Sequence, residues 1–233
     1  MSVVLTEYYG WHLSLGLVEY HRVLNWQHQL VNLRREGMVR DTIITVEHPP
    51  VVTVGRDGHP ENWADLKEQP VFIERGGDVT YHGPGQAVVY FIFNLARRGK
   101  DLHLFMDQIQ EGVIRALAEY GVAAERGQEN TGVWVDGRKI ASIGIAVKHW
   151  ISFHGVAVNI NTELKEFERI HPCGLESSVM TSLRNQLGRE VPLPEFVEKL
   201  VGHYGDVFET VFTPVSLDEL AEDVESQDGG GHV

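Results

Sequence analysis

Three stretches of the sequence repeat apolar residues three and four positions apart, which is the spacing of one face of an α-helix. They are residues 17–35, 101–120 and 194–208. Residues typical of helix ends mark their limits: Gly37 lies where a C-cap is expected, Asp101 can cap a helix start, and Pro194 suits a first turn. The pattern therefore predicts three amphipathic helices.

Elsewhere apolar residues alternate with polar ones or form short β-branched runs, as they do in β-strands. The predicted strands are 3–9, 42–47, 51–54, 71–74, 87–93, 133–135, 140–147 and 151–160. Asp136-Gly137 is typical of a type I′ hairpin turn, and a second hairpin is expected near residues 148–150. Because several strands follow one another without a helix, a regular βαβ alternation is excluded. We expect an α+β fold with a mixed, largely antiparallel sheet and flanking helices.

Length and cysteine content narrow the class of protein. A chain of 233 residues with a single cysteine has no intramolecular disulfide, which excludes a disulfide-stapled extracellular scaffold and favours a cytoplasmic location. The longest apolar run, residues 87–96, is far shorter than the roughly 20 residues that cross a bilayer, so we expect no membrane segment. We expect one domain at 1–215 and an acidic, flexible tail at 216–233.

The charge balance excludes a further class. The chain has 20 Lys and Arg against 33 Asp and Glu, a net charge of −13. Proteins that bind nucleic acid need a basic face for the phosphates, so no nucleic-acid partner is expected.

One candidate for chemistry is the glycine-rich segment 75–86, which follows a predicted strand. Glycines let backbone N–H groups approach a ligand, and Arg75, Thr80, Tyr81 and His82 add side-chain donors. The segment matches neither the Walker nor the dinucleotide fingerprint. A ligand-binding loop and a plain series of turns are therefore both compatible with it.

The second candidate is the only cysteine, Cys173. Pro172 and Gly174 on either side disfavour a regular helix or strand, which would leave the thiol on an accessible turn. A free thiol is only a few per cent ionised at pH 7, and lowering its pKa by about 1.5 units takes about 2 kcal/mol, which one ammonium at about 4 Å can supply. Lys139, next to the first hairpin, is a candidate cation. The alternative is that Cys173 is a small buried apolar residue.

A metal site and a serine-based site are both disfavoured. The residues His82, His154, His171 and Cys173 follow no known ligand spacing, and no GxSxG motif is present. We expect neither a metal nor a cofactor.

Four ordered motifs resemble one protein family. They are residues 75–86, 131–145, 153–162 and 170–183. Together they are similar to the octanoyltransferases of lipoate biosynthesis, the LipB family. The resemblance implies a fold like that of biotin and lipoate protein ligases, and transfer of octanoyl from acyl carrier protein to a lysine of lipoyl domains. The implied acceptors are the E2 subunits of 2-oxoacid dehydrogenases and the glycine cleavage H protein, and we expect the enzyme to be a monomer.

The same resemblance assigns residues by position. Cys173 corresponds to the acyl-accepting nucleophile and Lys139 to its partner, and His82 is a candidate for orienting the two. The positions that correspond to the acyl-binding segments are Arg75, Gly76, Gly77, Asp78, Val79, Thr80, Tyr81, His82, Ser142, Ile143, Gly144, Gly155, Val156 and Ala157.

The chemistry agrees with this assignment. Exchange of one thioester for another is nearly balanced, and transfer to an amine runs downhill, so no ATP is needed and ping-pong kinetics are expected. Removing the proton of the acceptor lysine costs about 4.6 kcal/mol at pH 7, because its pKa is near 10.4. We expect Lys139 to act as the base, and a basic rim to attract the acidic partners. The candidate rim residues are Arg75, Arg138, Lys148 and Arg184.

Two other functions fit the same features. An ATP-dependent lipoate or octanoate protein ligase would share the implied fold and need no thiol. A catalytically silent protein that binds lipoyl domains or carrier protein would only pack Cys173.

Overall fold

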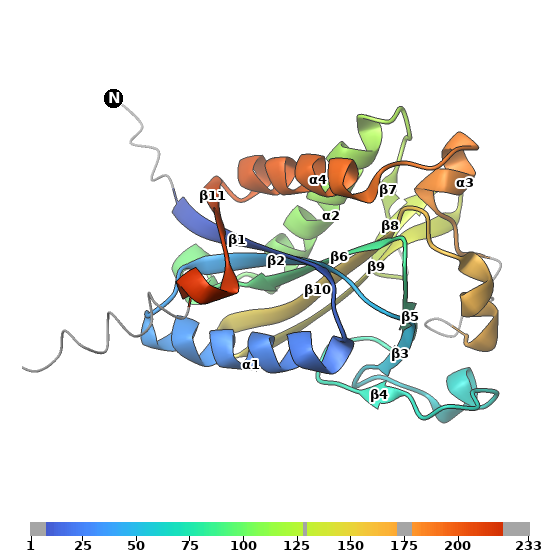
Figure 1. Cartoon of the computed structure of the whole chain (residues 1–233), viewed down its shortest axis with the longest axis horizontal. Coiled ribbons are helices and arrows are strands. Elements are labelled where there is room, and N and C mark those ends of the chain that lie inside the picture. The colour runs from blue at the N-terminus through green and yellow to red at the C-terminus, as the bar shows by residue number, and fades with distance from the viewer. Residues whose placement is uncertain (1–7, 128–129, 172–178, 221–233) are drawn as a thin grey trace, which may run out of the picture.

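A computed structural model describes residues 8–127, 130–171 and 179–220. Its centre is an eight-stranded mixed sheet with the order β11-β1-β2-β6-β10-β9-β8-β7 (Figure 1). Strand β1 runs parallel to both β11 and β2, and the other neighbours are antiparallel. The strands are β1 Tyr8–Leu17, β2 Asp41–Glu47, β6 Gln86–Ile92, β7 Glu125–Arg126, β8 Gly132–Val135, β9 Arg138–Lys148, β10 Ile151–Asn159 and β11 Thr210–Val215.

A second, three-stranded sheet lies beside one end of the large sheet, on the right of Figure 1. Its order is β4-β3-β5, with β3 Val51–Val54, β4 Val71–Phe72 and β5 Val79–His82. Three short 3₁₀ helices connect these parts: η1 Pro60–Trp63, η2 Leu95–Arg98 and η3 Leu164–Arg169.

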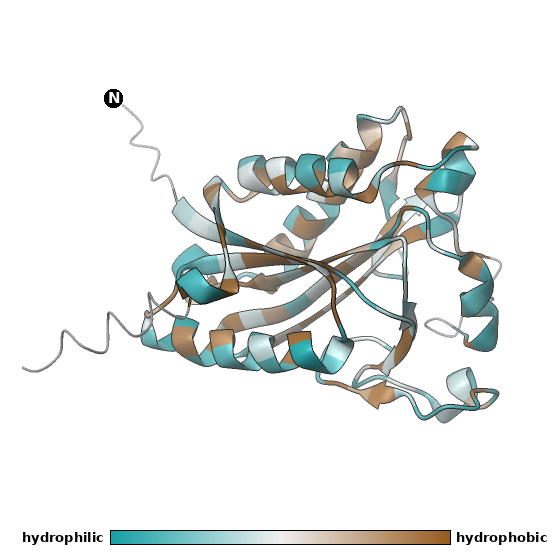
Figure 2. Cartoon of the chain, viewed as in Figure 1, coloured by the Kyte–Doolittle hydropathy of each residue, from teal (hydrophilic) through white to brown (hydrophobic). Residues whose placement is uncertain are grey.

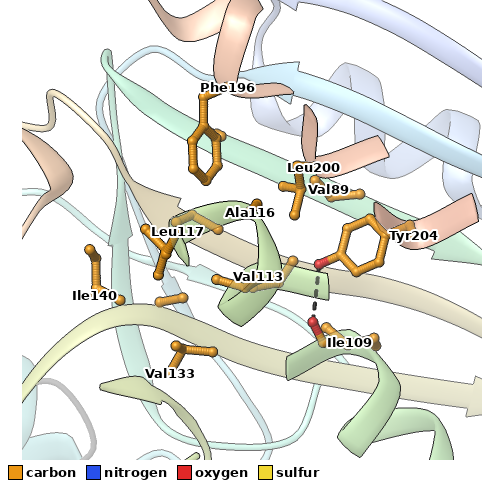
Figure 3. Close-up of a cluster of buried hydrophobic side chains, with 14 of the residues drawn as sticks. Val89, Ile109, Val113, Ala116, Leu117, Val133, Ile140, Phe196, Leu200 and Tyr204 are labelled. Atoms are coloured by element: carbon orange, nitrogen blue, oxygen red, sulfur yellow. Dashed lines mark hydrogen bonds between the residues drawn. The ribbon is translucent and has the colours of Figure 1, made fainter. Parts of the chain in front are cut away.

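Helices cover both faces of the large sheet (Figure 1). They are α1 Tyr20–Glu36, α2 Leu102–Ala118, α3 Leu183–Leu187 and α4 Leu193–Val207. Helix α1 packs on one face, and α2 and α4 pack on the other, where Tyr204 Oη donates a 3.2 Å hydrogen bond to the carbonyl of Ile109 (Figure 3). The strands between these layers are mainly apolar, whereas the outer faces of the helices are polar (Figure 2). The predicted α+β fold class is therefore confirmed.

Most element ends agree with the sequence. Gly37 caps α1 with φ 84°, and the Asp101 side chain accepts a hydrogen bond at the start of α2. Both predicted hairpins are present, and their turn residues have positive φ: Asp136 48° and Gly137 73° in the first, His149 53° and Trp150 63° in the second. Positive φ at both central residues is what a type I′ turn requires.

Several assignments differ from the prediction, and α3 and β7 are among the elements that were not predicted. The first described strand, Tyr8–Leu17, extends well beyond the end of the predicted strand 3–9, and α1 begins at Tyr20 and not at residue 17. Residues 1–7 lie outside the described residues, so that part of the prediction is not tested. The middle of the glycine-rich segment is a strand, β5, and not a loop. Strand β11 was not predicted because it is an edge strand with few buried side chains and lacks a strict apolar alternation.

The chain after β11 begins a further helical turn. Glu219 N–H donates to Ser216 Oγ, and Ser216 N–H donates to Glu219 Oε2, which is a capping box. Leu220 is buried in the cluster beneath α1. The rest of the expected tail, 221–233, lies outside the described residues, and the boundary at 215 stays a prediction. In the described ranges no helix combines the length and apolarity needed to cross a bilayer.

Candidate active site

A cavity with about 500 Å³ of unfilled space lies between the small sheet, the start of α1 and strands β6, β10 and β9. The lining residues are Tyr20, Arg75, Gly77, Val79, Thr80, His82, Val88, Tyr90, Lys139, Ser142, Ile143, Gly144, His154, Gly155, Val156 and Ala157.

The cavity brings together most of the residues that the sequence motifs suggested, although the motifs are far apart in the chain. Those in the lining are Lys139, Arg75, Gly77, Val79, Thr80, His82, Ser142, Ile143, Gly144, Gly155, Val156 and Ala157. Three residues of the suggested set, Gly76, Asp78 and Tyr81, are not in the lining. Cys173 lies outside the described residues.

Gly76, Asp78 and Tyr81 contact segments next to the lining. On β5, Val79, Thr80 and His82 line the cavity, while the Tyr81 ring packs 5.5 Å from the ring of Phe167. Asp78 accepts hydrogen bonds from the Asn62 side chain and from His59 N–H, and Gly76 N–H donates to the carbonyl of Ile145 on β9.

Two glycines in the lining allow main chains to approach closely. A Cβ on Gly155 would lie 1.8 Å from the carbonyl oxygen of Val89 on β6. A Cβ on Gly144 would lie 2.7 Å from Cδ of Arg75. Both distances are far below van der Waals contact, so a side chain at either position would displace the strand or the arginine.

Lys139 is almost fully buried, with 2% of its surface exposed. Its Nζ lies 5.7 Å from the centre of the Trp134 ring. A Cβ on Gly132 would lie 2.6 Å from Lys139 Cε, so the absence of a side chain there makes room for the lysine stem. Lys139 also forms a parallel bridge with Met180, and Thr181 N–H donates to the Lys139 carbonyl at 2.9 Å. The chain that follows 172–178 therefore runs directly beside Lys139.

Arg75 belongs to the interior of the site. It is 8% exposed, and its guanidinium donates to the carbonyl and the hydroxyl of Thr53, at 2.9 and 3.0 Å. The expectation that Arg75 belongs to an exposed basic rim is therefore wrong. Of the other rim candidates, Arg184 lies 4.0 Å from Glu163 and 3.9 Å from Glu190, whereas Arg138 and Lys148 are exposed.

Sequence reasoning missed a group of aromatic and histidine residues at the cavity. Tyr20 and Tyr90 line it, and His48 lies behind Tyr90. The His48 Nδ1 donates to the Val18 carbonyl at 2.6 Å, so its Nε2 accepts from the Tyr90 hydroxyl at 2.8 Å. Burial lowers the pKa of His48 to about 4 and raises that of Tyr90 well above its usual value. No spacing in the sequence marks these three residues.

His154 also lines the cavity, and it was weighed only as a metal ligand. Its φ is 60°, an uncommon value for a non-glycine residue inside a strand, and it is 1% exposed. Its Nε2 lies 3.6 Å from Glu74, whose other oxygen lies 3.1 Å from His28. Burial and the Arg75 charge lower the pKa of His154 to about 4, so its ring is neutral at pH 7. Within the described ranges, no three His, Cys, Asp or Glu residues gather as a metal site requires.

The fold and the cavity define the class of protein. The sequence matches the family described as "Lipoyl protein ligase A/B catalytic domain" over residues 19–205. Lipoate-protein ligase A bound with ATP superposes with a TM-score of 0.70, at 14% identity over 96% of this chain and 95% of that chain. Biotin protein ligase from Aquifex aeolicus gives 0.51, at 12% identity over 94% and 74%. At these identities the two structures show the fold, which confirms the expected likeness to lipoate and biotin protein ligases.

More similar sequences identify the family within this class. A protein of Caldicellulosiruptor saccharolyticus named octanoyltransferase is 45% identical over 217 residues, which is 89% of this chain and 92% of the relative. The octanoyltransferase of Thermosynechococcus vestitus is 42% identical over 219 residues, or 91% and 95%. The chain belongs to the octanoyltransferase family, as its motifs indicated.

Proposed function

We propose that this octanoyltransferase takes the octanoyl group from its thioester on acyl carrier protein and passes it to a lysine of a lipoyl domain through a thioester at Cys173. The proposed acceptors are the E2 subunits of 2-oxoacid dehydrogenases and the glycine cleavage H protein. The observation that carries the proposal is the burial of Lys139 in the lining of the cavity, where it pairs with Met180 of the chain that follows residues 172–178.

The described residues on either side of the segment 172–178 lie close to the cavity lining. Ile170 and Met180 are buried in one apolar cluster, which also contains Val79 of the cavity lining. On the N-terminal side of that segment, His171 N–H donates to the Asn62 carbonyl at 2.8 Å. On the other side, Met180 pairs with Lys139 itself.

In the first half-reaction the Cys173 thiolate attacks the carbonyl carbon of the octanoyl thioester. A bond forms between that carbon and the Cys173 sulfur, and the bond to the carrier sulfur breaks. The Lys139 ammonium favours the thiolate beforehand and then gives a proton to the departing carrier thiol. The products are the acyl-enzyme, the free carrier thiol and a neutral Lys139.

In the second half-reaction the amine of the acceptor lysine attacks the same carbon. The new carbon–nitrogen bond replaces the bond to Cys173, which leaves as a thiolate. The acceptor arrives as an ammonium and loses two protons, of which one returns to neutral Lys139 and the other goes to solvent. The thiolate and the ammonium of the resting enzyme are thereby restored, and no ATP enters either step.

Thr80 is suited to bind the carbonyl oxygen of the acyl group. Its hydroxyl is buried, lines the cavity, and has no hydrogen-bond partner among the described residues. An unpaired buried hydroxyl costs free energy, which a ligand oxygen that accepts its hydrogen bond would recover. The same bond would strengthen as negative charge develops on that oxygen during attack.

The test is intact-mass spectrometry after mixing the protein with octanoyl carrier protein. We expect one octanoyl adduct that hydroxylamine removes, that is absent from Cys173→Ala, and that disappears when a lipoyl domain is added. Because Cys173 is the only cysteine, a thioester adduct is assigned without mapping. A Cys173→Ala protein that still octanoylates the lipoyl domain from octanoate and ATP would instead show a ligase, and binding without any adduct would show a silent partner protein.

A further inference from the structure

We propose that Gln86 and Asn159 are positioning residues that hold His82 as the tautomer protonated on Nδ1, so that His82 Nε2 accepts a hydrogen bond from the attacking amine. The inference rests on the proposed transfer to a lysine. It concerns a buried row of polar side chains behind the cavity, for which the proposed reaction gives no role.

The row is continuous. His82 Nδ1 lies 2.8 Å from Gln86 Oε1, and Gln86 Nε2 lies 3.0 Å from Asn159 Oδ1. Asn159 Nδ2 lies 3.1 Å from the Thr181 carbonyl. All four residues are buried, with at most 6% exposed. Water therefore does not compete for these bonds.

Two main-chain carbonyls determine the direction of every bond in the row. A carbonyl oxygen can only accept. Gln86 places a terminal atom 3.2 Å from the Tyr81 carbonyl, so that atom is the NH₂ nitrogen and the amide oxygen faces His82. Asn159 is fixed in the same way by the Thr181 carbonyl, so its oxygen faces Gln86. Because the Gln86 oxygen can only accept, the proton of the imidazole is on Nδ1, and Nε2 carries a lone pair.

The row also connects His82 to Lys139. Thr181, whose carbonyl ends the row, donates its N–H to the Lys139 carbonyl at 2.9 Å. The nearest described partner of His82 Nε2 is the Thr53 hydroxyl at 3.5 Å, which is longer than an ordinary hydrogen bond. His82 and Lys139 both line the cavity. An amine that enters the cavity can therefore meet both residues, giving one proton to Lys139 and sharing another with Nε2.

His82 is suited to accept a hydrogen bond and not to take the proton. Burial is the largest cause that lowers its pKa to about 3, and the charges of His48, Arg75 and His154 lower it further, whereas the bond to Gln86 raises it. Tyr20 of α1 also faces it, with its ring stacked at 5.8 Å. The ring is thus neutral across the physiological range, and its basicity is too low for it to compete with Lys139.

The direct test is the ¹⁵N NMR signature of the His82 ring in the unmodified protein, assigned by its loss in His82→Asn. We expect a protonated Nδ1 and an unprotonated Nε2 from pH 6 to pH 8. A proton on Nε2 in this range would overturn the proposal. This measurement needs no activity and no further variant, so it is independent of whether Cys173 is acylated.

The kinetic test separates the two half-reactions. In His82→Asn an amide can still donate to Gln86 but Nε2 is absent, so we expect discharge of the acyl-enzyme to a lipoyl domain to slow about tenfold while acylation by octanoyl carrier protein is little changed. In Gln86→Glu the carboxylate raises the pKa of His82, so discharge should fall as the pH decreases through the raised value. The exposed Gln29→Glu on α1 adds the same charge and should behave as the unmodified protein.

Equal slowing of both half-reactions in His82→Asn, or an unchanged pH profile of discharge in a folded Gln86→Glu, would contradict the role of the row. Absence of any adduct in the unmodified protein would instead contradict the proposed function. The two failures are therefore distinguishable.

Discussion

Replacing Lys139 by methionine removes the ammonium while keeping most of the volume of the buried stem. Lys139 is 2% exposed and packs between Gly132 and the Trp134 ring, so a shorter residue would leave a cavity and a polar one would be left unpaired. Methionine is apolar and flexible, and it suits such a space. The substitution should therefore change the charge in the cavity lining more than the packing.

The expected effect on the Cys173 thiol follows from Coulomb's law. An ammonium at about 4 Å in an effective dielectric near 20 contributes about 4 kcal/mol, of which a shift of about 1.5 units in pKa uses about 2. A thiol with a pKa near 7 is about half ionised at pH 7, whereas one with a pKa near 8.5 is about 3% ionised. Lys139→Met should therefore lower the thiolate population at pH 7 about fifteenfold.

Alkylation by iodoacetamide as a function of pH measures this population directly. The chain has one cysteine, so the label reports Cys173 alone. We expect the midpoint of the rate profile to rise by about 1.5 units in Lys139→Met. The matched control is Lys148→Met, which removes an exposed lysine at the far end of the same strand and should leave the midpoint unchanged. Identical midpoints for the unmodified protein and Lys139→Met would refute the ionisation of Cys173 by Lys139.

Three further predictions follow from the described contacts. Asp41 is buried between Arg34 and Arg98, at 2.7 and 2.8 Å. Because two guanidiniums lose their partner, Asp41→Ala should lower the free energy of unfolding by about 3–5 kcal/mol in urea titrations. A loss below about 1 kcal/mol would show that the pairs are solvated. Thr80→Val should slow acylation, measured as the rate of adduct formation, about tenfold or more, and thermal melting should show no loss of stability. Unchanged acylation would exclude Thr80 as a donor to the carbonyl oxygen. The pKa of His48 is about 4 in the folded protein and near 6.5 in the unfolded chain, so the unfolded chain binds the extra proton and the free energy of unfolding decreases as the pH falls from about 6.5 to 4. Over this range a folded His48→Gln should lose up to about 3 kcal/mol less of its free energy of unfolding than the unmodified protein. Equal losses would show that His48 does not titrate there.

The elements that could be predicted from the sequence are those whose pattern comes from local chemistry. Helix α2 has a capping aspartate and a stripe of apolar residues, and both hairpins have turns with positive φ. Strand β6 was found because all seven of its residues are buried and the run is continuously apolar. Strand β5 was missed, since its glycine-rich surroundings are typical of a loop, and its partner β3 lies more than 20 residues earlier in the chain.

The candidate site could be predicted only in part, and the reason is physical. Motifs with glycine at defined positions marked segments 75–86, 131–145 and 153–162, but no motif marked Tyr20 or Tyr90. Those two reach the cavity because α1 crosses the sheet next to β6, which is a property of the tertiary packing. His154 reaches it through a local backbone conformation, φ 60°, that a strict strand alternation does not contain.

For His82 alone, too, one property follows from the sequence and another depends on tertiary packing. His82 was a candidate from its motif, yet its protonation state depends on Gln86, four residues later, and on Asn159, in another motif. Neither amide is informative alone, because an amide can present either its oxygen or its nitrogen. The carbonyls of Tyr81 and Thr181 fix which end of each amide faces which partner, because a carbonyl oxygen can only accept. These carbonyls contact the amides because β5, β6, β10 and the chain after residue 178 come together at one end of the sheet. The chemistry of His82 is therefore decided by packing, and a substitution that moves any of these four segments should change the tautomer before it changes the fold.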